Sequence, residues 1–221
     1  MVFDLDGTLI SCRPKQMAAL RAVSGISGNN ISNVWQLKRD GLSTRDALLN
    51  IGVSAENADE IALRWVRVIE TPYFLSFDNL LSGAAESLKL CRTRGFRTVI
   101  LTARHSYRSV ILQSNALRLN SMSDEILVVD PQDGVKRKAE ELLRINACIL
   151  IGDSEVDAQA ASTAGVAFHA VSSGQRSFTF LQRKLGRDPF ESVLPATLAV
   201  LNEGNCHEPI NQSNASKDTK W

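Results

Sequence analysis

The sequence predicts a two-domain α/β protein, in which a doubly wound parallel sheet carries a small α-helical domain inserted after its first strand. From Asn79 onward, short apolar segments alternate with segments of helical periodicity. The apolar segments are nearly continuous, which is typical of parallel strands covered on both faces. Residues 13–78 interrupt this alternation and are helical only. We therefore expect an α/β core from residues 1–12 and 79–201 and a helical cap from residues 13–78.

The chain opens with a short apolar lead, Met1-Val2-Phe3, which ends at the acidic Asp4-Leu5-Asp6 segment. Three residues before Asp4 are few for a central strand, which leaves open whether the N-terminus is truncated. In the cap, Ser43 and Asp46 form the pattern of a capping box. Residues 54–69 follow with apolar residues at helical spacing, and Thr71-Pro72 ends that helix.

The alternating part of the chain predicts helices over 83–91, 107–114, 138–145 and 156–164, and strands over 97–102, 126–129, 147–151 and 166–171. Polar residues lie at the ends of four predicted strands: Asp4, Thr102, Asp130 and Asp153. Ligands of parallel sheets bind at the carboxyl ends of the strands. Residues 202–221 are polar without periodicity, which predicts a disordered tail.

The composition argues against several classes of protein. Hydrophobic residues make up 44% of the chain and charged residues 22%, which is ordinary for a soluble globular protein. A net charge of +1 gives no sign of a surface for nucleic acid or acidic membranes. No apolar run is long enough to span a membrane, and the N-terminus lacks the basic region of a signal peptide.

The four cysteines (Cys12, Cys91, Cys148 and Cys206) lack C-x-x-C spacing. This pattern indicates reduced thiols in a cytosolic protein rather than a disulfide frame or a zinc site. We therefore expect a cytoplasmic protein.

Asp4 and Asp6 are the strongest functional signal. Carboxylates two residues apart on an extended segment project to the same side. Like charges at close range are costly unless a divalent cation or a shared proton uses them. Gly7 then allows a tight turn with a close approach of the backbone.

Four motifs occur in order at the predicted strand ends: Asp4-Leu5-Asp6-Gly7-Thr8, Leu101-Thr102-Ala103-Arg104, Lys136/Lys138 and Gly152-Asp153-Ser154-Glu155-Val156-Asp157. The set resembles the haloacid dehalogenase superfamily of phosphohydrolases, over nearly the whole chain to about residue 201. The resemblance implies that Asp4 attacks phosphorus to form an aspartyl-phosphate. It implies that Asp6 protonates the leaving oxygen and later activates water.

The resemblance also implies a Mg²⁺ cofactor held by Asp4, the backbone carbonyl of Asp6 and Asp153, with support from Asp157. These oxygen ligands suit Mg²⁺. The hydroxyl of Thr102 and the amide of Ala103 would bind phosphate oxygens. A lysine would neutralise the remaining charge, and both Lys136 and Lys138 are candidates, with Lys138 favoured.

The stretch from Leu37 to Arg45 resembles the substrate-specificity segment in caps of the phosphoglycolate phosphatase and β-phosphoglucomutase group, so Arg39 and Arg45 are candidate substrate contacts. We expect a Mg²⁺-dependent phosphatase, monomeric or homodimeric, that acts on a small phosphate monoester such as a sugar phosphate or a phosphoglycolate-like metabolite. A phosphomutase and a non-catalytic regulator that binds a phospho-ligand are the alternatives. Asp6 argues against a dehalogenase, and phosphonate cleavage would need Lys15 or Lys38 as a Schiff-base former.

Overall fold

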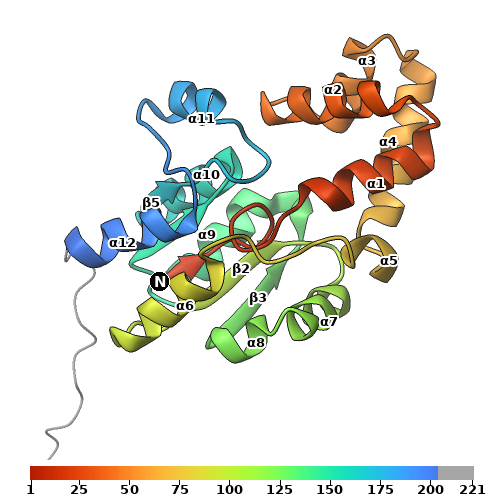
Figure 1. The fold of residues 1–221 in the computed structure, drawn as a ribbon. Helices are drawn as coiled ribbons and strands as arrows, with labels where there is room; N and C mark the ends of the chain where they lie inside the picture. The colour runs from red at the N-terminus through yellow and green to blue at the C-terminus, as the bar shows by residue number, and fades with distance from the viewer. Residues whose placement is uncertain (204–221) are drawn as a thin grey trace, which may run out of the picture.

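The computed structural model describes residues 1–203, and its centre is a parallel sheet with the strand order β3-β2-β1-β4-β5 (Figure 1). The strands are β1 (Val2–Phe3), β2 (Val99–Ala103), β3 (Glu125–Val129), β4 (Ile149–Gly152) and β5 (Ala167–Ala170). Val2 pairs with Val99 on one side and with Leu150 on the other, so the short β1 lies at the sheet centre. The strand order reverses between β1 and β4, which is where ligands bind to such sheets. The predicted fold class is confirmed.

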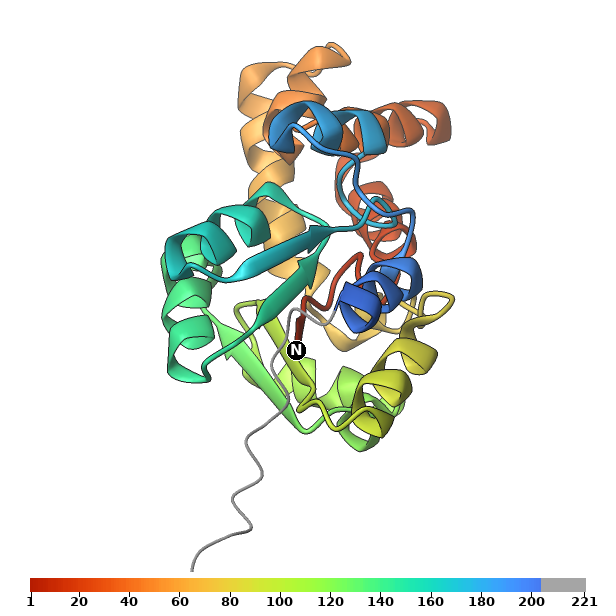
Figure 2. The ribbon, with the colours of Figure 1, turned by 90° about the vertical axis from the view of Figure 1, so that its left-hand side faces the viewer.

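Helices cover both faces of the sheet (Figure 2). Because successive side chains of a strand point to opposite faces, Phe3, Ile100 and Ile151 share one hydrophobic core while Val2, Leu101 and Leu150 share another. The first face is covered by α6 (Ala84–Thr93), α7 (Tyr107–Ala116), α8 (Leu119–Met122) and α12 (Val193–Glu203). The second is covered by α9 (Gly134–Arg144) and α10 (Glu155–Ala164), with α11 (Phe178–Leu185) at its edge.

The segment between the first two strands forms a helical insertion, which we define as α1–α5. Its helices are α1 (Arg13–Ser24), α2 (Gly28–Arg39), α3 (Thr44–Asn50), α4 (Ala55–Ile69) and α5 (Pro72–Leu75). Helices α1–α4 share an apolar core of their own that includes Leu20, Ile31 and Leu48. The insertion stands beyond the carboxyl ends of the strands (Figure 1). The predicted capping of α3 by Ser43 is present, since the Ser43 hydroxyl accepts a hydrogen bond from the Asp46 amide at 3.1 Å.

Two connections join the helical insertion to the core, and they run side by side. The Ser11 amide donates to the Asn79 carbonyl at 2.8 Å, and the Asn79 amide donates to the Ser11 hydroxyl at 3.2 Å. A third contact comes from the other side, where the Ser177 amide before α11 donates to the Arg39 carbonyl at 2.9 Å. The insertion is therefore held over the sheet edge from two directions.

Two expectations about secondary structure differ from the structure. The helix expected over 138–145 begins at Gly134, because Asp130 caps a short 3₁₀ turn, η1 (Pro131–Asp133), that leads directly into α9. Helix α12 extends to Glu203 and so includes the first two residues of the expected tail, while 204–221 lie outside the described residues.

The expectation of free thiols is confirmed for the buried Cys12 and Cys91 and wrong for Cys148, which is disulfide-bonded. Cys206 lies outside the described residues. None of the helices in residues 1–203 has the length and apolar character that crossing a membrane requires.

Candidate active site

Three buried carboxylates meet at the point where the strand order reverses. Asp4 directly follows β1, Asp153 directly follows the neighbouring β4, and Asp157 lies in the first turn of α10. One carboxyl oxygen of each lies within 4.8 Å of those of the other two. The Ser154 hydroxyl caps α10 by accepting from the Asp157 amide, which fixes Asp157 against the strand ends. The fold thus brings Asp4 next to Asp153 and Asp157, which lie 149 and 153 positions further along the chain.

Asp153 is enclosed by two glycine-containing turns. A Cβ atom at Gly7, where φ is +84°, would lie 2.1 Å from Asp153 Oδ2, and one at Gly174 would lie 1.9 Å from the same atom. The Gln175 amide donates to Asp153 Oδ2 at 2.5 Å. Only residues without a Cβ permit this close approach, so the turn after β1 and the loop after β5 together fix the position of Asp153.

Lys138 joins the carboxylates. Its Nζ donates to Asp4 Oδ1 at 2.6 Å and to Asp157 Oδ1 at 2.5 Å, and the side chain is buried. Burial by itself lowers the pKa of Lys138, but Asp157 and Asp4 outweigh burial and raise it above its usual value. Lys136, the other candidate, is exposed on α9. Of the two lysines, the structure therefore brings Lys138 to Asp4.

The cluster carries more negative charge than its own cation can neutralise. Burial, opposed by Lys138, raises the pKa of Asp4 to about 7. Burial, together with the charges of Asp4 and Asp157, raises the pKa of Asp153 well above its usual value. Three carboxylates against one ammonium favour an additional cation, and a set of oxygen donors only fits Mg²⁺.

A cavity of about 320 Å³ opens beside this cluster, between the sheet edge and the helical insertion, and we call it the central cavity. Thr102 and Ala103, at the end of β2, line it together with Asp4 and Lys138. The structure therefore places the residues expected to bind phosphate and the proposed nucleophile on one surface.

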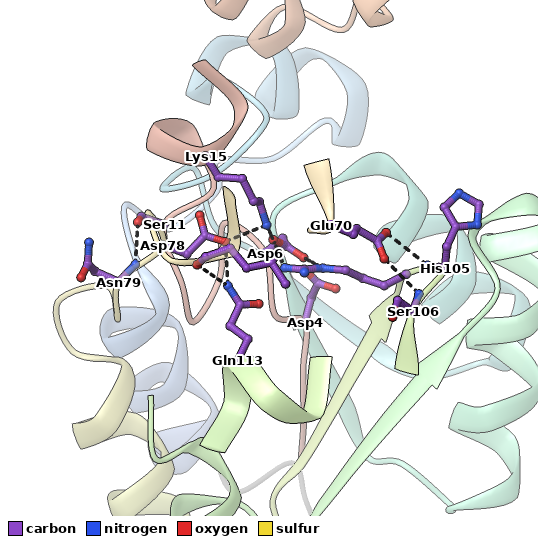
Figure 3. Close-up of polar contacts among 12 residues, drawn as sticks. Asp4, Asp6, Ser11, Lys15, Glu70, Asp78, Asn79, His105, Ser106 and Gln113 are labelled. Atoms are coloured by element: carbon purple, nitrogen blue, oxygen red, sulfur yellow. Dashed lines mark hydrogen bonds and ion pairs between the residues drawn. The ribbon is translucent and has the colours of Figure 1, made fainter. Parts of the chain in front are cut away.

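Asp6 belongs to a second polar network at the same cavity (Figure 3). Arg104 donates to both of its oxygens, Nε to Oδ2 at 2.7 Å and Nη2 to Oδ1 at 2.6 Å, and Lys15 Nζ lies 2.8 Å from Oδ1. Lys15 also lies 2.7 Å from Asp78 Oδ2, which accepts from Gln113 Nε2 at 2.9 Å. Burial alone would raise the pKa of Asp6, but Arg104 and Lys15 hold it well below its usual range.

Sequence reasoning assigned no role at the site to Arg104, and it considered Lys15 only for phosphonate cleavage. Arg104 directly follows the Thr102-Ala103 motif, so its place after the strand was a usable signal. Lys15 lies in the first turn of α1, and its contact with Asp6 depends on the path of the chain between β1 and α1.

The helical insertion supplies the wall of the central cavity opposite the sheet. The lining residues from the insertion are Lys15, Gln16, Trp65, Val66, Ile69 and Glu70. The Glu70 carboxylate accepts from the amides of His105 and Ser106, at 3.2 and 2.9 Å, and so ties α4 to the core before α7 (Figure 3). Trp65 is half-buried, packs against the apolar core of the insertion and also lines the cavity.

The two arginines expected to contact substrate lie elsewhere. Arg39 Nη2 donates to the backbone carbonyls of Ser172 and Arg176, at 2.9 and 3.3 Å, so Arg39 ties α2 to the core. Arg45 is exposed and forms an ion pair with Asp59. Neither residue lines the central cavity.

Comparison with known proteins agrees with this geometry. Residues 1–165 match the family model of haloacid dehalogenase-like hydrolases. No curated protein matches the chain.

Solved structures share its fold at low identity. A haloacid dehalogenase-like family protein from Streptococcus pneumoniae is 17% identical with a TM-score of 0.69, and covers 91% of this chain and 96% of its own. A predicted phosphatase from Clostridium acetobutylicum is 19% identical with a TM-score of 0.67, covering 91% and 97%. A predicted phosphoglycolate phosphatase from Haemophilus somnus is 15% identical with a TM-score of 0.63, covering 90% and 96%. Because the family model matches well over half of the 221 residues, this chain belongs to the haloacid dehalogenase-like hydrolases.

Proposed function

We propose that the chain is a Mg²⁺-dependent phosphatase that hydrolyses a small phosphate monoester through an aspartyl-phosphate intermediate. The observation that carries the proposal is the position of Asp4 at the point where the strand order reverses. There, Asp4 lies with Asp153 and Asp157 on one side and borders a cavity lined by Thr102 on the other.

Asp4 is the proposed nucleophile. A carboxylate can approach a phosphoryl group only where cations offset the repulsion between the two anions. Lys138, at 2.6 Å from Asp4, supplies one positive charge at that place. The attack moves phosphorus from the ester oxygen to a carboxyl oxygen of Asp4, and water then hydrolyses the acyl phosphate.

Mg²⁺ would be held by the carboxylates of Asp4 and Asp153 and the backbone carbonyl of Asp6, with Asp157 in support. When bound, it supplies positive charge that stabilises the phosphoryl group during transfer. The Thr102 hydroxyl and the Ala103 amide would bind phosphate oxygens beside it.

Asp6 is the proposed acid and base. Its ion pairs with Arg104 and Lys15 keep it ionised, which suits the activation of water in the second step. Protonation of the leaving oxygen in the first step requires Asp6 to exchange these partners for a proton. The helical insertion, whose Lys15 holds Asp6, would act as a cap that covers the substrate and excludes water.

The test is the hydrolysis of a panel of phosphate monoesters by the purified chain, with Mg²⁺ and with a chelator, followed as release of inorganic phosphate. Borohydride reduction during turnover should convert the acyl phosphate at Asp4 to a homoserine, which peptide mass spectrometry would locate. Hydrolysis that is insensitive to the chelator, or homoserine at a position other than Asp4, would refute the mechanism.

The same assay separates the alternatives. A phosphomutase would convert a sugar phosphate into its isomer and release little inorganic phosphate. A regulator would bind a phosphate ester without turning it over.

A further inference from the structure

The helical insertion contains a buried lysine with no ion-pair partner among residues 1–203. Lys38, in the last turn of α2, is 8% exposed. Its Nζ donates to Gln16 Oε1 at 2.6 Å and lies 4.1 Å from the centre of the Trp65 ring. A buried ammonium without a carboxylate is costly, and burial lowers the pKa of Lys38 to about 7. The position of this lysine therefore calls for a role beyond packing.

Lys38 determines how the Gln16 amide is oriented. Because Lys38 Nζ donates to Oε1, the oxygen of the Gln16 amide faces Lys38 and its NH₂ group points away from it. The NH₂ end of the amide has no acceptor among residues 1–203, and Gln16 lines the central cavity. A group inside the cavity is therefore the natural acceptor for these N–H donors.

The cations around Gln16 differ in whether they are neutralised. Lys15 is paired with Asp6 and Asp78, and Arg176 is paired with Glu155. Lys38 has no carboxylate partner of this kind among residues 1–203, so an anionic group bound at Gln16 would favour the charged form of Lys38. Trp65, Val66 and Ile69 next to it offer apolar surface to a short carbon segment.

We propose that Gln16, oriented by Lys38, is a specificity-determining residue that selects phosphate esters whose leaving group carries a carboxylate. The carboxylate oxygen accepts from the Gln16 amide and neutralises the charge behind it, while the phosphate lies at Asp4. Lys38 is a positioning residue that acts through Gln16. This inference rests on the proposed phosphatase function.

Binding to an Asp4→Asn protein tests the inference without turnover. We would measure the Kd values of 2-phosphoglycolate and ethyl phosphate by calorimetry with Mg²⁺ present, since these esters differ in one carboxylate. The wild-type Gln16 background should prefer 2-phosphoglycolate. Gln16→Leu should weaken its binding by about 10- to 100-fold, the range for a hydrogen bond to a charged group, and change ethyl phosphate by less than about threefold.

Gln16→Glu is the second variant. It keeps the size of the side chain and forms an ion pair with Lys38, so it should fold at least as well as the parent. It replaces the donors by acceptors, so it should lower the affinity for 2-phosphoglycolate at least as much as Gln16→Leu. Gln36→Leu on the exposed side of α2 is the matched control and should leave both Kd values unchanged.

A double-mutant cycle tests the positioning role of Lys38. Lys38→Met should weaken 2-phosphoglycolate binding, and adding Gln16→Leu to it should cost much less than Gln16→Leu alone, because both act on one contact. Lys89→Met, an exposed lysine on α6, is the control. Additive losses would show that Lys38 does not act through Gln16.

The outcomes separate this inference from the proposed function. Equal affinity for the two esters, no binding of 2-phosphoglycolate, or an equal loss for both esters in Gln16→Leu would overturn the inference. Absence of hydrolysis of any ester by the wild-type chain would overturn the phosphatase function, and the binding preference would still decide the role of Gln16.

Discussion

The two sides of the central cavity hold carboxylates in opposite electrostatic settings. On the sheet side, Asp4, Asp153 and Asp157 share the single cation Lys138. Where the core meets the helical insertion, two carboxylates lie with two cations, because Lys15 bridges Asp6 and Asp78 while Arg104 donates two hydrogen bonds to Asp6.

This difference separates a site that needs a ligand from a network that is complete in charge. Burial and mutual repulsion raise the pKa of Asp4 and of Asp153, whereas two cations lower that of Asp6. A bound cation would reduce the repulsion among Asp4, Asp153 and Asp157, whereas the charges of Asp6 and Asp78 are already neutralised by Lys15 and Arg104. The pKa values of Asp4 and Asp6 are thus shifted in opposite directions, although the two residues are only two positions apart.

The largest effect expected is on turnover, from the sheet side. Asp4→Asn removes the nucleophile but keeps nearly the same shape, so it should lower kcat by at least about a thousandfold. It also removes one of three repelling charges, so the melting temperature of the metal-free protein should not fall. Steady-state assays with p-nitrophenyl phosphate and calorimetric unfolding would check both. Near-normal turnover would exclude Asp4 as nucleophile.

The next largest effect is expected on stability, when the network of Lys15, Asp6 and Asp78 loses its lysine. Lys15→Met leaves the buried Asp78 and the half-buried Asp6 without their shared cation, and we expect the free energy of unfolding to fall by about 3 kcal/mol. Urea denaturation measures it. Arg64→Met, which removes an exposed pair with Glu60 on α4, is the matched control and should change little. Equal effects of the two variants would mean that the Lys15 network is not a structural unit.

A third effect is the pH dependence of Mg²⁺ binding. The pKa of Asp4 is raised to about 7, so the metal-free protein holds a proton there below neutral pH, and Mg²⁺ has to displace it. The affinity should therefore rise with pH by up to about tenfold per unit below pH 7 and level off above it. Calorimetric titration with Mg²⁺ between pH 6 and 8 measures this. Asp4→Asn should flatten the profile, and a flat profile in the unmodified protein would contradict the raised pKa.

The part of the site that the sequence predicted is the part set by local pattern. Apolar segments of strand length predict where each strand ends, and Asp4 and Asp153 directly follow such ends while Thr102 lies in the last two residues of β2. A parallel sheet then brings its carboxyl ends to one edge without further information. This is why residues from distant parts of the chain could be grouped before any contact was known.

The opposite wall could not be predicted in this way. The hydrogen bond between Lys38 and Gln16 and the place of Trp65 at the cavity depend on how α1, α2 and α4 pack over the sheet. Helical periodicity predicts which stripe of each helix is buried, but it does not predict the angle between helices. Arg39 and Arg45 lie in a stretch typical of substrate-specificity segments, yet one ties α2 to the core and the other is exposed.

The smallest effect expected separates these two arginines. Arg45 is paired with Asp59 on the exposed surface and is absent from the cavity wall, so Arg45→Ala should keep kcat/KM within about twofold for every ester tested. Arg39→Ala removes two hydrogen bonds between α2 and the loop before α11, so it should lower stability by about 1 kcal/mol. Because Arg39 touches the backbone of Arg176, a cavity residue, its loss should lower kcat/KM equally for 2-phosphoglycolate and p-nitrophenyl phosphate. If either variant lowered kcat/KM for only one of the two esters, the arginine would contact substrate when the insertion closes, as expected from the sequence.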